Sequence, residues 1–221
     1  YNLEGPPIMG VLPRPAPLTV REFGQAMGQG MTVLDVRSPE AYASVSIPDS
    51  LACPLDMLPA FAGYFLDYGQ PIGLVLEDPE QLETTVRRLV RMGYDDIKGF
   101  LSGGISAWQE AGRPYQAIPA MHVNELRDRM GEDGLRILDV RSAGEYEQVH
   151  LPDVRHFYLG KLPEEFENIP RDGTIVTLCG SGQRALIAAS ILKRQGHDDV
   201  QNCFGSMAAC AAVGCEMEKG D

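Results

Sequence analysis

The sequence contains a long internal repeat, and this repeat limits the possible folds more than any other feature. The segment Val-Leu-Asp-Val-Arg at residues 33–37 returns as Ile-Leu-Asp-Val-Arg at residues 137–141, 104 positions later. The same spacing aligns Ile-Pro-Asp at 47–49 with Leu-Pro-Asp at 151–153. Solenoid repeats span about 20–50 residues, so a period near 100 is too long for one. The chain should therefore hold two copies of one domain.

The two copies set the expected domain boundaries. Residues 1–17 contain five prolines, a composition typical of a stiff, extended linker. We expect the first domain over residues 18–116, because Gly112-Arg113-Pro114 closes the first copy. The second domain should cover residues 117–221. A chain of 221 residues is long enough for each copy to bury a core of its own.

Each copy alternates short apolar runs with segments of helical periodicity. Strands are predicted at 33–36, 72–76, 137–140 and 174–178, and helices at 81–92 and 183–195. This alternation predicts an α/β fold in which a mostly parallel central sheet carries helices on both faces. Ligands of such sheets bind where the carboxyl end of a strand meets the next helix. The candidate sites are therefore residues 77–81 and 179–184.

The loop whose residues are best suited to catalysis or binding runs from Cys179 to Arg184. It reads Cys-Gly-Ser-Gly-Gln-Arg. Its glycines allow backbone N–H groups to converge on one point, and the dipole of the following helix adds to their positive field. A thiolate at Cys179 would be stabilised there, and Arg184 adds a fixed positive charge. A buried structural cysteine before a tight turn explains the same residues, and the pattern alone does not choose between the two readings.

The order of several motifs resembles the rhodanese family. In the second copy these motifs are Asp139-Val140-Arg141, Glu145-Tyr146, His150-Leu151-Pro152 and the loop from Cys179 to Arg184. In the first copy they are Asp35-Val36-Arg37, Glu40, Ile47-Pro48 and Gly103-Gly104-Ile105-Ser106-Ala107-Trp108. The resemblance implies two tandem rhodanese-like domains.

The resemblance also implies an activity. A rhodanese-type sulfurtransferase would carry sulfane sulfur as a persulfide on Cys179, between a small donor, such as thiosulfate or a persulfide, and a thiol acceptor. Such chemistry belongs to sulfide, persulfide and thiosulfate metabolism and requires no cofactor. The loop that binds substrate and persulfide would comprise Gly180, Ser181, Gly182, Gln183 and Arg184.

The length of the loop separates two chemistries within this type of fold. Related phosphatases and arsenate reductases place five residues between the cysteine and the arginine, often with a histidine before the cysteine. Here four residues separate Cys179 from Arg184, and Leu178 precedes the cysteine. Within the resemblance, the shorter loop favours sulfur transfer over hydrolysis. The alternative is that both copies are non-catalytic docking or regulatory modules of a larger protein.

The first copy lacks the cysteine, since Glu77 occupies the position of Cys179. Asp78 and Gln81 form a capping box, with Pro79 in the first helical turn. Carboxylates of the chain itself therefore occupy the helix end that would hold a thiolate in the second copy. We expect this domain to reject anions and to serve a structural or docking role.

Other candidate residues are interpreted as structural. Asp139 and Arg141 recur as aspartate and arginine at positions 35 and 37 of the copy without a cysteine. We therefore expect salt bridges from these arginines to the nearby Glu145 or Glu40. His150 should be packed or hydrogen-bonded, and the histidines show no metal-ligand spacing, so no metal site is expected.

The remaining cysteines are Cys53, Cys203, Cys210 and Cys215. We expect them to act as small apolar residues. A resolving role for one of the last three, which would convert a Cys179 persulfide into a disulfide, is the alternative.

Charge and cysteine content restrict the partners and the compartment. The net charge of −12 argues against binding to nucleic acid or to an anionic membrane surface. An odd number of cysteines, five, cannot all pair within one chain, which favours a reducing, cytoplasmic compartment. Residues 1–7 are similar to the junction in fusions of a metallo-β-lactamase-fold domain with tandem rhodanese domains, of the persulfide dioxygenase type. We therefore expect a metal-dependent, hydrolase-like domain outside this sequence.

Overall fold

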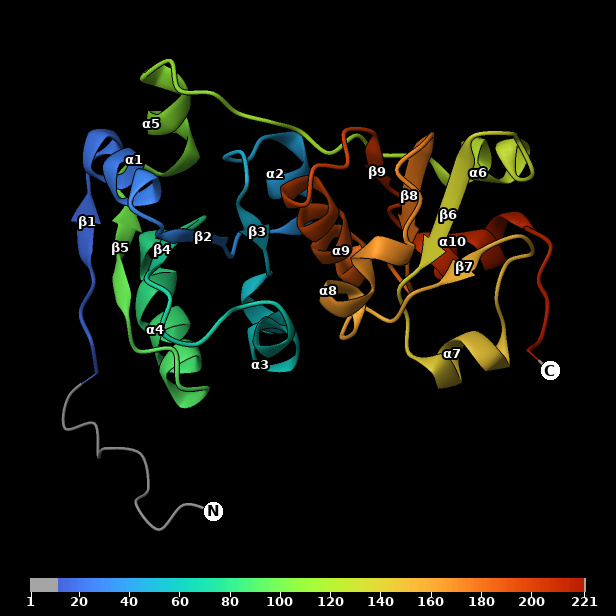
Figure 1. The fold of residues 1–221 in the computed structure, drawn as a ribbon, viewed down its shortest axis with the longest axis horizontal. Helices are drawn as coiled ribbons and strands as arrows, with labels where there is room; N and C mark the ends of the chain where they lie inside the picture. The colour runs from blue at the N-terminus through green and yellow to red at the C-terminus, as the bar shows by residue number, and fades with distance from the viewer. Residues whose placement is uncertain (1–11, 221) are drawn as a thin grey trace, which may run out of the picture.

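Two parallel sheets lie side by side in the computed structural model, which describes residues 12–220 (Figure 1). The strand order is β1-β5-β4-β2-β3 in the first sheet and β7-β6-β8-β9 in the second. Every strand pair is parallel, and helices flank both sheets. The predicted α/β fold of two similar domains is thereby confirmed.

The first domain contains five strands and five helices among the described residues. The strands are β1 (Ala16–Leu18), β2 (Thr32–Asp35), β3 (Leu51–Ala52), β4 (Ile72–Val75) and β5 (Ile97–Leu101). The helices are α1 (Val20–Gly28), α2 (Pro39–Ser44), α3 (Leu58–Phe61), α4 (Leu82–Arg91) and α5 (Gly104–Glu110). Short 3-10 turns flank α3 and precede α4.

The predicted proline-rich linker is too long at its carboxyl end, because its last residues belong to the first sheet. Ala16 and Pro17, which we assigned to the linker, lie in β1 and pair with β5. Because β1 is an edge strand, a proline without an N–H group is tolerated there. Residues 1–11 of the predicted linker lie outside the described residues.

The second domain repeats this order with a shorter sheet. Its strands are β6 (Leu135–Asp139), β7 (Arg155–His156), β8 (Thr174–Leu178) and β9 (Val200–Asn202). Its helices are α6 (Val123–Arg129), α7 (Ala143–Gln148), α8 (Leu162–Glu165), α9 (Gln183–Arg194) and α10 (Ser206–Val213). The counterpart of β1 is reduced to a single parallel bridge between Ala120 and Asn202.

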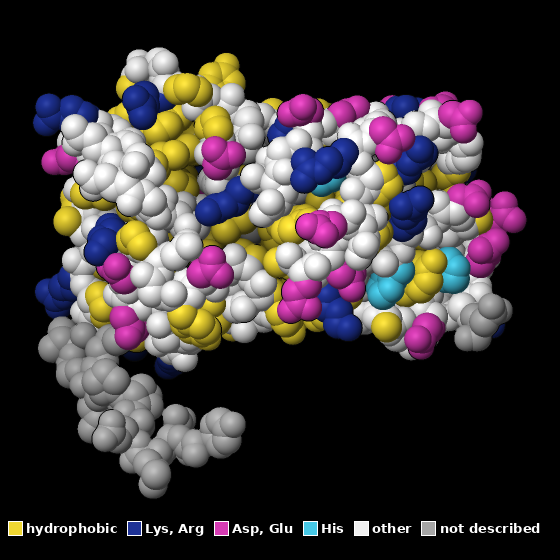
Figure 2. All heavy atoms as spheres, in the orientation of Figure 1, with side chains coloured by type: hydrophobic (Ala, Val, Ile, Leu, Met, Phe, Trp, Pro, Cys, Tyr) yellow, Lys and Arg dark blue, Asp and Glu magenta, His cyan; other side chains and the backbone are white. Residues whose placement is uncertain are grey.

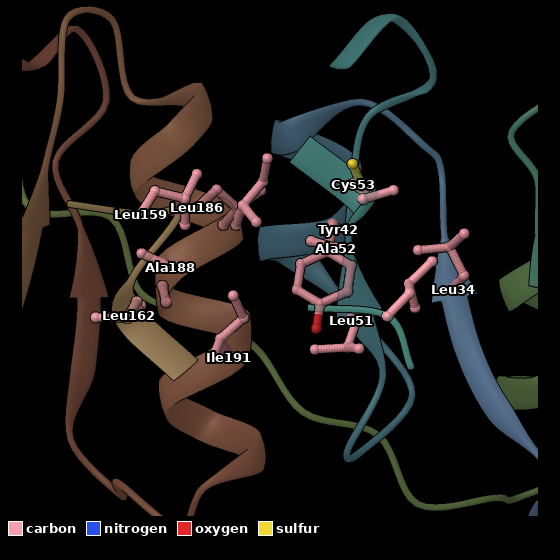
Figure 3. Close-up of a cluster of buried hydrophobic side chains, with 14 of the residues drawn as sticks. Leu34, Tyr42, Leu51, Ala52, Cys53, Leu159, Leu162, Leu186, Ala188 and Ile191 are labelled. Atoms are coloured by element: carbon pink, nitrogen blue, oxygen red, sulfur yellow. The ribbon is translucent and has the colours of Figure 1, made fainter. Parts of the chain in front are cut away.

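Helix α9 lies between the two sheets. It packs on β8 and β9 of its own domain and on β3 and α2 of the first domain. Figure 3 shows Ala188 on the side of α9 toward Leu159 and Leu162, and Ile191 on the side toward Leu51 of β3. Every residue from Ala185 to Leu192 is buried, as expected of a helix that is covered on both sides. One hydrophobic cluster therefore extends through both domains.

A hydrogen bond between the domains closes the exposed edge of the first sheet. The backbone N–H of Ala52 in β3 donates to the Ser190 hydroxyl of α9 at 3.0 Å. The same hydroxyl donates to the carbonyl of Ile187 at 2.7 Å. An edge strand with a free N–H group is open to pairing with another chain. Here the second domain covers that edge.

The segment that connects the domains is attached to both of them. Gln116 and Ser46 exchange two backbone hydrogen bonds of 2.8 and 2.9 Å, and the N–H of Ile118 donates to the carbonyl of Ala43. Asn202 of β9 is bonded to the segment on the other side, through Pro119 and Met121. The connection is therefore an ordered part of the fold.

Candidate functional site

Cys179 lies directly after β8, at the start of the loop that leads into α9. Its residue surface is 1% exposed, and the N–H of Gly182 donates to Sγ at 3.0 Å. Gly182 has a φ of +100°, and a Cβ at this position would lie 2.9 Å from the Cα of Phe204. Only glycine fits this conformation and this close approach. The loop thus directs one backbone N–H at the thiol, whereas the sequence predicted that several would converge there.

The amino end of α10 fixes the backbone of this loop. The N–H groups of Met207 and Ala208 donate to the carbonyls of Cys179 and Gly180, both at 3.0 Å, and a further backbone bond joins the N–H of Gly205 to the carbonyl of Ser181, also at 3.0 Å. These are the free donors expected in the first turn of a helix. Because successive carbonyl groups are held by α10, the loop keeps the orientation in which the N–H of Gly182 faces sulfur.

Arg184 lies beside the loop, but its charge is paired. Its two terminal nitrogens donate to the two carboxylate oxygens of Glu145, each at 2.7 Å. The hydrogen bond from Arg184 and those from Ser142 lower the pKa of Glu145 to about 2 against the opposing effect of burial. The same ion pair, with a contribution from Cys179, raises the pKa of Arg184. A Cβ at Gly180 would lie 3.2 Å from Nη2 of Arg184, which places the guanidinium against the loop.

Arg141 and Arg37 form salt bridges, but the predicted partners, Glu145 and Glu40, were wrong. Arg141 binds Asp139, two residues before it, with Nη2–Oδ2 at 2.6 Å, and also donates to the carbonyl of Val149 at 2.7 Å. Arg37 binds Asp35 in the same way, at 2.7 Å. Both pairs are buried, and they tie the end of a strand to the residue that follows the next helix. This geometry fits a structural role in both copies.

In the first domain the corresponding loop is filled by side chains. Glu77 accepts hydrogen bonds from the N–H and the hydroxyl of Ser38, at 3.0 and 3.2 Å. Gln81 accepts from the N–H groups of Glu77 and Asp78, at 3.3 and 3.4 Å, and Asp78 accepts from the N–H of Glu80. The predicted capping box is present. Donors that could hold an anion are therefore already engaged.

The other four cysteines are buried parts of the core. Cys53, Cys203 and Cys210 are 0% exposed. Burial raises the pKa of Cys203 to about 11 and raises those of Cys53 and Cys210 as well. Thiols of this kind are poor nucleophiles. The packing agrees with their predicted role as small apolar residues.

His150 is a packed and hydrogen-bonded residue, as predicted. Its ring stacks on Tyr146, with centroids 4.0 Å apart, and Nδ1 lies 3.0 Å from the Tyr146 carbonyl. Among residues 12–220 no group of three or more His, Cys, Asp or Glu side chains is arranged to hold a metal ion.

An aromatic pair from both domains lies near the ion pair of the site. The Tyr158 hydroxyl donates to the Tyr64 hydroxyl at 3.4 Å, and the two rings meet edge-on with centroids 6.1 Å apart. The hydrogen bond to Tyr64 raises the pKa of Tyr158, and the charges of Arg184 and Glu145 also act on it. The sequence did not reveal this contact, because it depends on how the two domains pack.

A cleft of about 630 Å³ lies between the domains, but it is not the cysteine site. It is lined by Leu51 and Gln70 from one side and by Ile191 and Arg194 from the other. Ile191 and Arg194 are at the carboxyl end of α9, whereas Cys179 precedes its amino end.

On the face shown in Figure 2, acidic and basic side chains are interspersed rather than gathered by sign. No helix in the described part of the chain is long and apolar enough to span a bilayer.

The family model of the rhodanese-like domain matches residues 19–111 and 122–212. A protein named sulfurtransferase from Allochromatium vinosum is 32% identical over 90 residues, which are 40% of this chain and 84% of that protein. YrkF of Bacillus subtilis is 34% identical over 92 residues, which are 41% of this chain but only 50% of YrkF. The chain therefore spans about half the length of that relative.

Two further proteins are similar at lower identity. The thiosulfate sulfurtransferase GlpE of Pseudomonas savastanoi is 29% identical over 91 residues, which are 41% of this chain and 82% of GlpE. The crystal structure of a thiosulfate sulfurtransferase from Pseudomonas aeruginosa is 21% identical, with a TM-score of 0.41. That match covers 93% of this chain and 44% of the solved one.

Proposed function

The chain belongs to the rhodanese-like family, and on that premise we propose that its second domain is a sulfurtransferase that carries sulfur on Cys179. The observation that supports this most directly is the hydrogen bond from the Gly182 N–H to the cysteine sulfur. A donor in this position stabilises a thiolate and, after transfer, a charged persulfide. Similarity to proteins named sulfurtransferase and thiosulfate sulfurtransferase supports the same assignment.

The proposed reaction has two balanced steps. The Cys179 thiolate attacks the outer sulfur of a donor such as thiosulfate, the sulfur–sulfur bond of the donor breaks, and sulfite leaves with the bonding electrons. The enzyme then carries a persulfide. An acceptor thiolate attacks the terminal sulfur, which releases the acceptor persulfide and restores the Cys179 thiolate.

Roles within the loop follow from its contacts. The N–H of Gly182 faces the cysteine sulfur, and Gly180 allows Arg184 to approach the loop. Ser181 and Gln183 are exposed on the outer side of the loop, where a donor would enter. Arg184 is already paired with Glu145, and the carboxylate offsets its positive charge. Its main role is therefore to orient the loop, and its electrostatic attraction for an anionic donor is secondary.

The wider setting is also a proposal. We place the enzyme in the cytoplasm, in sulfide, persulfide or thiosulfate metabolism, as part of a fusion with a metal-dependent domain. The observation behind the fusion is the similarity of residues 1–7 to such junctions. The mass of the protein detected by antibody in its own cells tests the fusion, and a mass no larger than 24.1 kDa would exclude it.

The test of the nucleophile is mass spectrometry after incubation with thiosulfate. The wild-type chain should gain the mass of one sulfur atom, located on Cys179, and should lose it to cyanide as thiocyanate. Cys179→Ser should gain none. As matched controls, single replacements of Cys53, Cys203, Cys210 and Cys215 by serine should still load. A wild-type chain that gains no sulfur would instead favour the docking or regulatory alternative.

A further inference from the structure

Ser206, the first residue of α10, has an unusual backbone conformation. Its φ is +44°, a region that non-glycine residues rarely occupy, and its surface is 0% exposed. The corresponding residue of the first domain is Gly104, with a φ of +60°. A glycine would adopt this conformation without strain, as Gly104 does. Residues held in strained conformations of this kind cluster at functional sites.

The Ser206 hydroxyl contacts the backbone of the reactive cysteine. It accepts a hydrogen bond from the N–H of Cys179 at 3.1 Å and donates to the carbonyl of Cys203 at 2.6 Å. The last backbone bond between β8 and β9 lies just before, from the N–H of Cys203 to the carbonyl of Thr177. The serine therefore bridges the two strands at the point where their ladder ends and supplies a partner for a buried N–H.

The first domain satisfies the equivalent N–H group in another way. There the N–H of Glu77 donates to the side chain of Gln81, which folds over its own loop. The counterpart of Gln81 in the second domain is Gln183, whose side chain is exposed. The serine holds Cys179 from the side of β9 and α10, so no side chain has to lie across the outer face of the loop.

We propose that Ser206 is a positioning residue for Cys179, which holds the cysteine backbone so that Sγ meets the Gly182 N–H while the outer face of the loop stays open to the sulfur donor. This inference deepens the proposed sulfurtransferase function and rests on it. Ser206 does not touch the donor. Its removal should therefore lower the rate of sulfur loading and leave the apparent affinity for thiosulfate nearly unchanged.

Two variants separate positioning from simple stability. Ser206→Gly removes the hydroxyl and also the backbone strain, whereas Ser206→Ala removes the hydroxyl and keeps the strain. We expect Ser206→Gly to melt close to the wild type, because the relief of backbone strain offsets the hydrogen bond that the buried N–H of Cys179 loses. Ser206→Ala should melt at a lower temperature, because it loses the same hydrogen bond and keeps the strain. Both should load sulfur at least about tenfold more slowly, since small misplacements of a reacting group are costly. Gly104→Ser is the matched control in the first domain, and it should load at the wild-type rate.

The readouts are the rate of persulfide formation against thiosulfate concentration, the thermal midpoint, and the rate of iodoacetamide alkylation at Cys179. A Ser206→Gly variant that loads at the wild-type rate would overturn the positioning role. If the wild-type chain itself takes up no sulfur, the proposed function fails. The alkylation rates then still decide the role of Ser206, because a slower reaction in Ser206→Gly supports it and an equal one refutes it.

Discussion

At the scale of single residues, the two copies differ by a linked set of substitutions around one loop. In the second copy Glu145 accepts from the N–H of Ser142 at 3.1 Å and also binds Arg184. In the first copy the equivalent N–H, that of Ser38, donates to Glu77 instead. Glu77, which occupies the position of Cys179, thus accepts the hydrogen bond that Glu145 accepts in the second copy. The positions of Glu145 and Arg184 are occupied there by Ala41 and Leu82. Glu40, which the sequence comparison matched with Glu145, lies one residue before Ala41 in the chain.

Replacing Glu145 by glutamine should change the acid stability of the protein. The pKa of Glu145 is lowered from 4.5 to about 2, so its ion pair stabilises the folded state fully above pH 4.5 and is lost as the pH falls toward 2. The side chains of Arg184 and Glu145 are 21% and 40% exposed, so we expect a loss of only about 1 kcal/mol at neutral pH. Denaturant unfolding at a series of pH values measures it.

The two stability curves should converge as the pH approaches 2, because the wild-type carboxylate is then protonated. Glu147→Gln, an exposed change on the same helix, is the control and should leave the curve unchanged. Curves for Glu145→Gln and wild type that stay parallel down to pH 2 would show that the ion pair does not titrate in this range.

At the scale of elements, the beginnings of α9 and α4 differ in how their backbone N–H groups are satisfied. The two helices follow equivalent strands: β4 precedes α4 and pairs with β2, and β8 precedes α9 and pairs with β6. The loop before α9 has two glycines and no side-chain cap, and the N–H of Gly182 donates to the Cys179 sulfur. The turn before α4 has Pro79, which lacks an N–H group, and a capping box between Asp78 and Gln81.

A cysteine at position 77 should therefore be inert. We expect Glu77→Cys, introduced into the Cys179→Ser chain, to take up no sulfur from thiosulfate. The reason is that the donors of this turn are bound to Asp78 and Gln81, and no glycine allows them to turn toward a thiolate. Mass spectrometry measures the uptake, with the unaltered Cys179 chain as the positive control. A gain of one sulfur on residue 77 would show that the loop sequence is not required.

The sequence predicted the elements of this site better than the contacts between them. The strand at 174–178 agrees with the structure at both ends, and the predicted helix at 183–195 ends one residue late. Both follow from apolar patterns that are local. The partner of Arg141 and the role of Ser206 depend on how separate segments meet, and no local pattern reports that. The two-residue strands β3 and β7 were missed because such short segments have no readable period.

At the scale of the whole molecule, the two copies are not independent. Helix α9 has no polar face, because β3 and α2 of the first domain cover the side that its own sheet leaves open. Residues 185–192 are apolar apart from Ser190, but a buried helix within a single domain would explain that pattern equally well. The connecting segment also binds both domains. The first domain therefore supports the helix that follows Cys179.

Ser190→Ala should reveal this coupling. It leaves the buried N–H of Ala52 without a partner, which should cost about 1–3 kcal/mol. The single tryptophan, Trp108, is buried in the first domain, so its fluorescence follows the unfolding of that domain alone. Ser190 belongs to the second domain. We nevertheless expect Ser190→Ala to lower the denaturant midpoint followed by tryptophan fluorescence as much as the midpoint followed by helical circular dichroism.

Ser44→Ala, an exposed change within the first domain, is the control, and we expect a shift of less than about 0.5 kcal/mol. A fluorescence midpoint that stays fixed in Ser190→Ala, while the circular dichroism midpoint falls, would show that the domains unfold separately.

The shared position of α9 has a consequence for how such chains diverge. A duplicated domain that lacks the cysteine would ordinarily be free to drift, yet β3 here is in contact with the helix that follows Cys179 in its sister copy. A bulkier side chain at Ala52 would have to be matched by a smaller one on α9. Among two-copy descendants of the same duplication, substitutions in β3 and in α9 should therefore covary, although these segments lie more than a hundred residues apart in the chain.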